Sequence, residues 1–161
     1  MSSLSFVISN HEFVVTEDKG LIVSIICNKT TCEPDTDMES LNEDLLIFKS
    51  VVIQFKEYFD GKRTSFEIPF RLECTEFQMR VLNEIKNINY GEVISYKDLS
   101  VLLFGNGNYS RAVGNALNHN PLLILLPCHR VIGSKGKLTG FKAGIDLKRI
   151  LLDLEKKNIL F

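Results

Sequence analysis

The chain has 161 residues, of which 45% are apolar, and a formal net charge of −1 at pH 7. This size suits one large folded domain or two small ones. No apolar run approaches the length of a membrane span, and residues 1–5 lack the basic and apolar regions of a secretory leader. These features predict a soluble protein without membrane association, located in the cytoplasm, or in the nucleus of a eukaryotic cell.

The small net charge conceals an asymmetry between the two halves. Residues 1–70 carry 6 basic and 12 acidic side chains, net −6, whereas residues 71–161 carry 13 and 8, net +5. Such a split favours a basic module that binds a polyanion, joined to an acidic domain, although uneven charge without a function is the alternative. We therefore expect two domains, 1–70 and 71–161.

The first domain has the pattern of a small α/β unit. Runs of β-branched and aromatic residues bounded by turn residues predict three strands, at 6–8, 13–15 and 21–27. Ser40 and Glu43 form a capping-box pattern, which predicts a helix that ends near Phe59. Residues 66–72 are expected to form an extended linker strand.

The four cysteines do not have the paired spacing of a zinc site. Cys27 and Cys32 could form a disulfide or share a metal, but unpaired thiols are the rule in a reducing compartment. We predict no metal and no cofactor.

The second domain is expected to be mostly helical. Thr75 and Gln78 form a second capping box, and Ser95 with Asp98 begins a further helix. A glycine-rich turn at 105–108 then separates that helix from another at about 109–119. Two helices joined by such a turn in a basic half outline a helix-turn-helix.

The helix at 109–119 has two different faces. At 100° per residue, one face is small and polar and the other is apolar: Arg111, Gly114, Asn115 and Asn118 against Ala112, Val113, Ala116 and Leu117. Gly114 costs a helix about 1 kcal/mol relative to alanine, which suggests close approach of another molecule. A solvated face and a nucleic-acid contact are both compatible with this pattern.

A thiol lies directly beside an imidazole at Cys128 and His129, after an apolar run at 122–126. The pKa of an ordinary cysteine is about 8.5, so an imidazole that removes its proton yields a usable nucleophile. Without further context, such a cysteine is more often buried and inert. Lys135 and Lys137 follow in glycine-rich loops that could touch phosphates.

The last helix is expected to begin near Asp146 and to bury an apolar stripe of Leu147, Ile150, Leu151 and Leu154. Glu155 lies beside this stripe. A carboxylate at the edge of a core needs a partner, which a buried histidine could supply. An ion pair with a surface lysine is the alternative.

Taken together, these motifs resemble the methylated-DNA–protein-cysteine methyltransferases, also called O6-alkylguanine-DNA alkyltransferases. The hallmark Pro-Cys-His-Arg-Val stands at 127–131, and further similar stretches lie at 57–61, 75–78, 90–96, 111–116, 120–121, 140–144 and 148–155. The resemblance implies an α+β protein, with an N-terminal ribonuclease-H-like α/β domain and a mostly helical winged helix-turn-helix domain that holds the active-site cysteine.

The resemblance also implies a mechanism. Cys128 would accept the alkyl group, and His129 would take the thiol proton through a water while Glu155 orients and stabilises the imidazolium. Tyr96 would assist rotation of the nucleotide and protonate the leaving guanine at N3. Transfer would be irreversible, so that one protein repairs one lesion.

The remaining implied roles concern DNA and the base. The partner would be double-stranded DNA with O6-alkylguanine, and O4-alkylthymine as a second substrate, bound by a monomer. Arg111 would fill the gap left by the extruded base, and Asn120 would hold the hinge after the recognition helix. Other DNA contacts would come from Gly114, Asn115, Asn118, Lys135 and Lys137, and the substrate pocket from Pro127, Val131, Phe141 and Lys142. Many relatives have tyrosine in place of Phe141.

Three other classes compete with this interpretation. A lesion-recognition protein that binds alkylated bases without turnover would lack the cysteine, so Cys128 argues against it. A Cys-His hydrolase would not need a helix-turn-helix, and a transcription factor would not need a Cys-His-Glu set.

Overall fold

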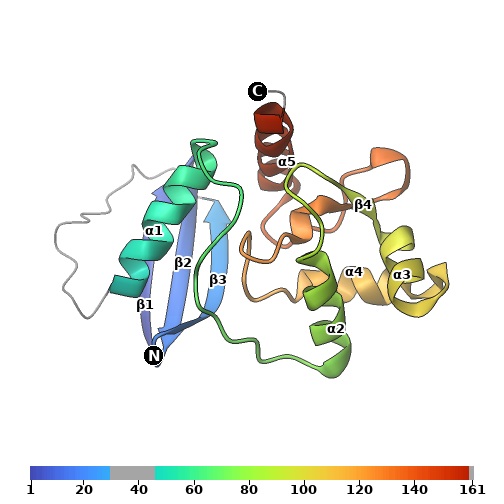
Figure 1. Cartoon of the computed structure of the whole chain (residues 1–161), viewed down its shortest axis with the longest axis horizontal. Coiled ribbons are helices and arrows are strands. Elements are labelled where there is room, and N and C mark those ends of the chain that lie inside the picture. The colour runs from blue at the N-terminus through green and yellow to red at the C-terminus, as the bar shows by residue number, and fades with distance from the viewer. Residues whose placement is uncertain (30–45, 160–161) are drawn as a thin grey trace. The chain divides into compact units, whose positions relative to one another are not determined.

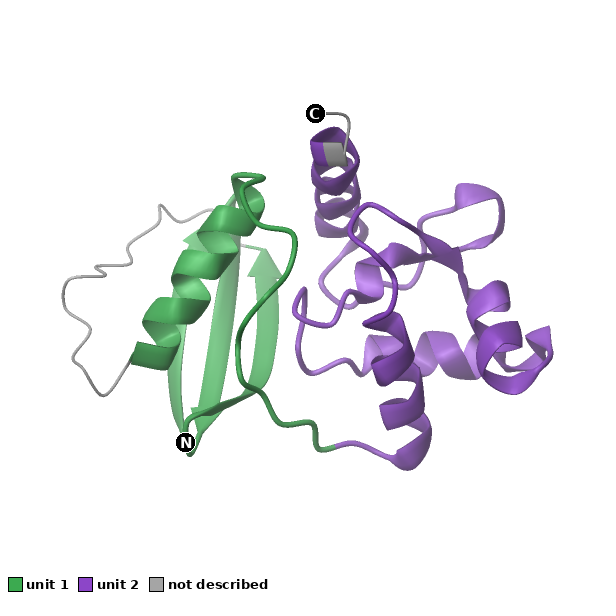
Figure 2. Cartoon of the chain, in the orientation of Figure 1, with its two compact units in different colours: residues 1–73 green, residues 74–161 purple. Residues whose placement is uncertain are grey.

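A computed structural model describes residues 1–29 and 46–159. The chain divides into two compact units, Met1–Glu73 and Cys74–Phe161 (Figures 1 and 2), whereas the sequence placed the boundary after residue 70. The capping box at 40–43 and Cys32 lie outside the described residues. No described helix is long and apolar enough to cross a membrane.

The first unit is a three-stranded antiparallel sheet covered on one face by a helix (Figure 1). The strands β1 (Ser2–Ile8), β2 (His11–Asp18) and β3 (Leu21–Lys29) pair in chain order. The helix α1 (Leu46–Phe59) packs its buried side against the sheet, with the Phe55 ring 5.7 Å from Phe6 and 5.4 Å from Phe13. The three predicted strands and the end of the helix at Phe59 are confirmed.

The segment at 66–72, expected to be an extended linker strand, pairs with the described part of the sheet at one position, a parallel bridge between Phe70 and Ile22. The backbone of Ile22 donates to Pro69 O at 3.0 Å and accepts from Arg71 N at 3.0 Å. Pro69 has no N–H, so it cannot extend the ladder. An apolar pattern alone did not reveal this interruption.

The second unit is mostly helical (Figure 2). Its elements are α2 (Glu76–Ile85), β4 (Ile94–Ser95), α3 (Tyr96–Phe104), α4 (Ser110–Asn118), β5 (Val131–Ile132) and α5 (Ile145–Ile159), with β4 and β5 paired in parallel. Both predicted helix starts are confirmed: Thr75 and Gln78 cap α2 reciprocally, and the Ser95 hydroxyl accepts from Asp98 N at 3.0 Å. A left-handed Gly105, with φ of 77°, ends α3 and opens the turn of the helix-turn-helix.

The packed faces of two helices differ from the predicted stripes. On α4, Val113, Ala116 and Leu117 are buried, but Ala112 is exposed. On α5, Ile150 is 37% exposed, whereas the charged Lys148 and Glu155 are fully buried. The core side of α5 therefore includes Glu155, which the sequence placed at the edge of the apolar stripe, and also Lys148, which was not predicted there.

Candidate active site

Asn120 holds the chain between α4 and the cysteine. Its amide nitrogen donates to Cys128 Sγ at 3.1 Å and to Leu126 O at 2.9 Å, and its Oδ1 accepts from Leu122 N at 3.0 Å. All hydrogen-bonding atoms of this buried side chain are thereby used within a few residues. This one residue fixes both the path of the turn and the environment of the sulfur.

Cys128 and His129 lie in a short 3-10 helix, Cys128–Arg130, rather than in a strand. In a strand, successive side chains would point to opposite faces. His129 Nε2 lies 2.9 Å from Glu155 Oε1, and both side chains are fully buried. The structure therefore supplies Glu155 with a buried histidine partner instead of a surface lysine.

Arg130 shares the carboxylate of Glu155. Its Nη2 donates to Oε1 at 2.8 Å and its Nε to Oε2 at 3.0 Å, while Gly91 N donates to Oε2 at 2.9 Å. Arg130 Nη1 also donates to Ile88 O at 2.7 Å. A site role for Arg130 was not predicted from the sequence, although a basic residue within a buried run signals a carboxylate partner.

Burial sets the resting protonation of the cysteine and the histidine. It raises the pKa of Cys128, against the opposing effects of the Asn120 hydrogen bond and the Lys148 charge. It lowers the pKa of His129, although Glu155 acts in the other direction and Arg130 offsets part of that effect. The resting pair is therefore a neutral thiol beside a neutral imidazole, which is able to accept a proton.

Lys148 connects α5 to the loop beyond β5. Its Nζ donates to Val131 O at 2.7 Å and to Thr139 O at 3.0 Å, and lies 3.4 Å from the Tyr96 hydroxyl. Burial lowers the pKa of Lys148 to about 8. A site role for Lys148 was not predicted from the sequence, although its position two helical turns before Glu155 puts both residues on one face of the helix.

Tyr96 begins α3, and its hydroxyl donates to Thr139 O at 2.9 Å. Burial, with a further contribution from Cys128, raises the pKa of Tyr96 to about 12. The hydroxyl therefore remains a proton donor near neutral pH. Gly140, with φ of 60°, lies against it: a Cβ there would be 3.3 Å from the Tyr96 oxygen.

A cavity of about 460 Å³ joins Tyr96 to the outer face of α4. Every residue of α4 that the sequence analysis proposed for DNA lines it, and the full lining is Tyr96, Ser110, Arg111, Gly114, Asn115, Asn118, Thr139 and Gly140. A Cβ on Gly114 would lie 3.7 Å from the Tyr96 ring, an ordinary contact, so the fold itself accommodates a side chain there. The glycine instead leaves room in the cavity.

The other predicted contact residues do not line this cavity. Pro127 and Val131 are buried on either side of the Cys128 turn. The Phe141 ring is half-buried, with its centre 5.7 Å from Lys148 Nζ. The three lysines Lys135, Lys137 and Lys142 are exposed.

Replacing Lys148 with methionine is expected to weaken the pH dependence of stability. The pKa of Lys148 is lowered from 10.5 to about 8 in the folded protein. Between these values the unfolded chain binds a proton that the folded chain has lost, so native stability rises with pH, by up to about 3 kcal/mol. The variant should lack this rise, as measured by urea unfolding across the window. Lys157→Met, at an exposed position of α5, serves as the control, and parallel curves for all three proteins would contradict the lowered pKa.

Comparison with known proteins agrees with this architecture. Residues 76–157 match the family model of the 6-O-methylguanine DNA methyltransferase DNA-binding domain, and residues 12–72 match that of its ribonuclease-like domain. The expected α+β fold, with a small sheet domain and a mostly helical DNA-binding domain, is confirmed.

Individual relatives are similar over most of their length. A methylated-DNA–protein-cysteine methyltransferase of Methanosarcina acetivorans is 46% identical over 141 residues, 86% of this chain and 87% of the relative. One from Metallosphaera sedula is 40% identical over 143 residues, 88% and 84% of the two chains. The crystal structure of Mycobacterium tuberculosis OGT in complex with DNA superposes with a TM-score of 0.76 and 35% identity, covering 91% of this chain and 88% of that one. The chain therefore belongs to the methylated-DNA–protein-cysteine methyltransferase family, and it is an enzyme of that class.

Proposed function

We propose that this protein repairs duplex DNA by moving the alkyl group of O6-alkylguanine, and of O4-alkylthymine, irreversibly onto Cys128. The observation that carries the proposal is a pair of hydrogen bonds at one buried turn, from Asn120 to Cys128 and between its neighbour His129 and Glu155. The same unit holds the cavity that Tyr96 shares with α4. A protein that only recognised the lesion would have no use for a thiol in this setting.

The lesion has to leave the helix to reach the sulfur. Cys128 is only 4% exposed, so a base stacked in a duplex cannot align its alkyl carbon with Sγ. Extrusion of a base costs a few kcal/mol, and a side chain that enters the gap offsets part of this cost. Among the described residues that line the cavity, Arg111 is the one cation, and it is exposed on the outer face of α4. Gly114 has no side chain, which lets the DNA backbone approach α4 closely.

The transfer itself is a displacement at carbon. Sγ attacks the alkyl carbon, the S–C bond forms as the C–O6 bond breaks, and the bonding electron pair goes to O6. The thiol proton passes through a water to His129, whose imidazolium Glu155 stabilises. Tyr96 turns its hydroxyl proton from Thr139 O to N3 of the guanine, which is thereby released as the neutral base within the DNA strand. The tyrosinate then takes one proton from solvent, and the imidazolium of His129 gives one proton to solvent.

Each protein monomer reacts once, because a thioether has no ready hydrolysis route.

Lys148 holds Val131 O and Thr139 O at the two ends of the loop after β5. That loop thereby forms a fixed wall for the extruded base. Pro127 belongs to the turn that holds the cysteine, and Phe141 and Lys142 follow the end of the loop. Lys135 and Lys137, at its exposed tip, are available for phosphates.

Intact-mass spectrometry tests the proposal directly. Reduced protein mixed with a duplex that contains one O6-methylguanine should gain about one methylene per chain, because S–H is replaced by S–CH₃ at the thiolate site. The same duplex with unmodified guanine should give no gain. Reduced protein that binds the modified duplex and keeps its original mass would show that it recognises the lesion without transfer.

Replacing Arg130 with methionine is expected to shift the acidic limb of the transfer rate to higher pH. His129 must be neutral to accept the thiol proton, and its pKa is now lowered chiefly by burial and in part by Arg130. Without the guanidinium, no cation next to Glu155 opposes its effect on the imidazole, so the pKa of His129 should rise. The rate should then fall severalfold on the acidic side while recovering at higher pH. Single-turnover rates measured across pH give the midpoint of the acidic limb, which is the pH at which the rate is half its maximum.

Two further variants separate this electrostatic role from a purely structural one. Arg130→Lys retains the positive charge and should keep the midpoint near that of the native protein. Arg149→Met removes an exposed cation of α5 and should change nothing. A rate lowered equally at every pH in Arg130→Met would mean that the guanidinium only maintains the fold.

A further inference from the structure

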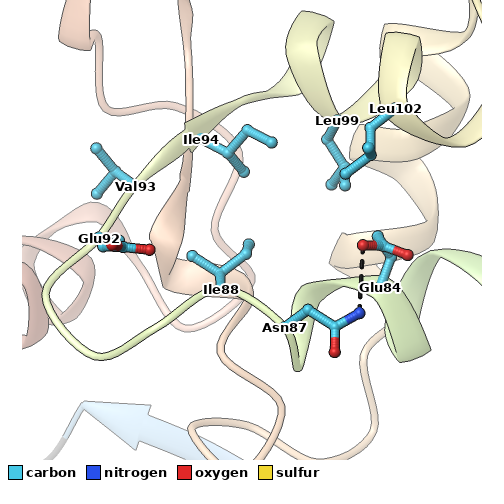
Figure 3. Close-up of a pocket in the computed structure, with 8 residues that line it drawn as sticks. All are labelled: Glu84, Asn87, Ile88, Glu92, Val93, Ile94, Leu99 and Leu102. Atoms are coloured by element: carbon cyan, nitrogen blue, oxygen red, sulfur yellow. Dashed lines mark hydrogen bonds between the residues drawn. The ribbon is translucent and has the colours of Figure 1, made fainter.

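A second hollow lies in the DNA-binding unit, between the end of α2, the segment that leads into β4, and α3 (Figure 3). Its volume is about 240 Å³, and it is lined by Glu84, Asn87, Ile88, Glu92, Val93, Ile94, Leu99 and Leu102. We call these eight residues the α2–α3 groove. None of them lines the cavity at α4, so the groove is separate from the proposed reaction site.

The groove exposes more apolar surface than its position in the fold requires. Leu99 is fully buried and forms its floor, but Leu102 is 62% exposed and Val93 is 50% exposed. Single exposed aliphatic residues are common on protein surfaces, whereas a cluster around a hollow is typical of a contact site. Packing of α3 against α4 does not account for Leu102, because its side chain faces this hollow (Figure 3).

Both charged residues that line the groove are acidic. Glu92 and Glu84 lie on opposite sides of the hollow (Figure 3). Each carboxylate accepts a hydrogen bond from an uncharged amide: Asn87 Nδ2 donates to Glu84 at 3.3 Å, and Asn89 Nδ2 donates to Glu92 at 3.0 Å. The described lining includes no lysine or arginine. Two carboxylates disfavour a phosphate backbone and favour a ligand with cations at both ends.

We propose that the α2–α3 groove binds a short basic segment of another protein, which inserts one aliphatic side chain between Leu99, Leu102 and Val93 and places a lysine or arginine beside each carboxylate. The volume lies below the range of about 300–1,000 Å³ that is typical of small-molecule sites, and it suits a single side chain. A partner held there leaves the face of α4 free, so the protein can engage DNA and this partner together. The inference does not depend on the transfer reaction.

Methyl NMR of the full-length chain tests the proposal with a defined probe, the acetylated and amidated pentapeptide Lys-Lys-Leu-Lys-Lys. Its addition should move the methyl signals of Val93, Ile94 and Leu102 in a saturable manner. A peptide with alanine in the centre should bind about tenfold more weakly, because it buries fewer methylene groups. Raising the salt from about 0.05 to about 0.5 M should weaken binding as well.

Variants with unchanged shape locate the charge requirement. The double variant Glu84→Gln/Glu92→Gln should bind the leucine peptide about tenfold more weakly. Glu73→Gln/Asp153→Asn removes the same charge at exposed positions outside the groove and should bind normally. The proposal is overturned if the groove methyls do not move, if the alanine peptide binds equally well, or if the double glutamine variant binds unchanged. It is equally overturned if duplex DNA moves the same methyl signals.

Discussion

Cys128→Ser is expected to abolish alkyl transfer while leaving DNA binding intact. The serine hydroxyl can replace the thiol as acceptor for Asn120 without crowding, since oxygen is smaller than sulfur. It is a far weaker nucleophile at carbon, and His129 cannot bring it to a comparable anionic state near neutral pH. The rate should therefore fall by more than about 10⁴-fold. The mass of the variant should stay constant in the O6-methylguanine duplex assay.

The control for this variant is another cysteine of the same unit. Cys74 is half-buried just before α2, away from the network of Asn120 and His129. Cys74→Ser should thus transfer at the native rate. DNA binding of both variants is measured by fluorescence anisotropy, and their folding by thermal unfolding. A folded Cys128→Ser protein that still gained the methyl group would place the acceptor elsewhere.

Local signals in the sequence predicted the helices of the second unit well. The reciprocal cap at Thr75 and Gln78 and the Ser95 cap involve groups only three residues apart, so the sequence contains the whole interaction. Leu102 shows the limit of such patterns. It has the spacing of a core residue of α3, yet it is 62% exposed, because whether a stripe is covered depends on elements distant in the chain.

The difference between local and distant interactions also explains which residues of the candidate site could be predicted from the sequence. Cys128 and His129 were found because they are adjacent, and Glu155 because a carboxylate beside an apolar stripe needs a partner. Arg130 and Lys148 were missed, since charged residues are ordinarily exposed. Arg130 meets its carboxylate 25 residues further on, and Lys148 is held by backbone carbonyls of Val131 and Thr139. Side-chain patterns do not encode the backbone acceptors of Lys148.

Arg111→Ala is expected to slow repair in duplex DNA by about 100-fold. The reason is the few kcal/mol that base extrusion costs, of which the inserted guanidinium offsets a part. The chemical step needs no such help once the base is out. Transfer from the free base O6-benzylguanine should therefore change less than about twofold. A single-stranded substrate, which has no partner strand to leave, should lie between these two cases.

A role in extrusion differs from an ordinary phosphate contact in what it changes. Loss of a phosphate contact weakens binding to every DNA sequence. It also lowers, by about one, the slope of the logarithm of the binding constant against the logarithm of the salt concentration. Loss of an inserted side chain lowers the rate even at saturating duplex. Arg149→Ala, which removes an exposed cation of α5, provides the matched control and should leave the rate at saturation unchanged. At saturating duplex, extrusion is a step that the free base does not need. Equal slowing of both substrates in Arg111→Ala would therefore assign Arg111 to the chemistry or the fold instead.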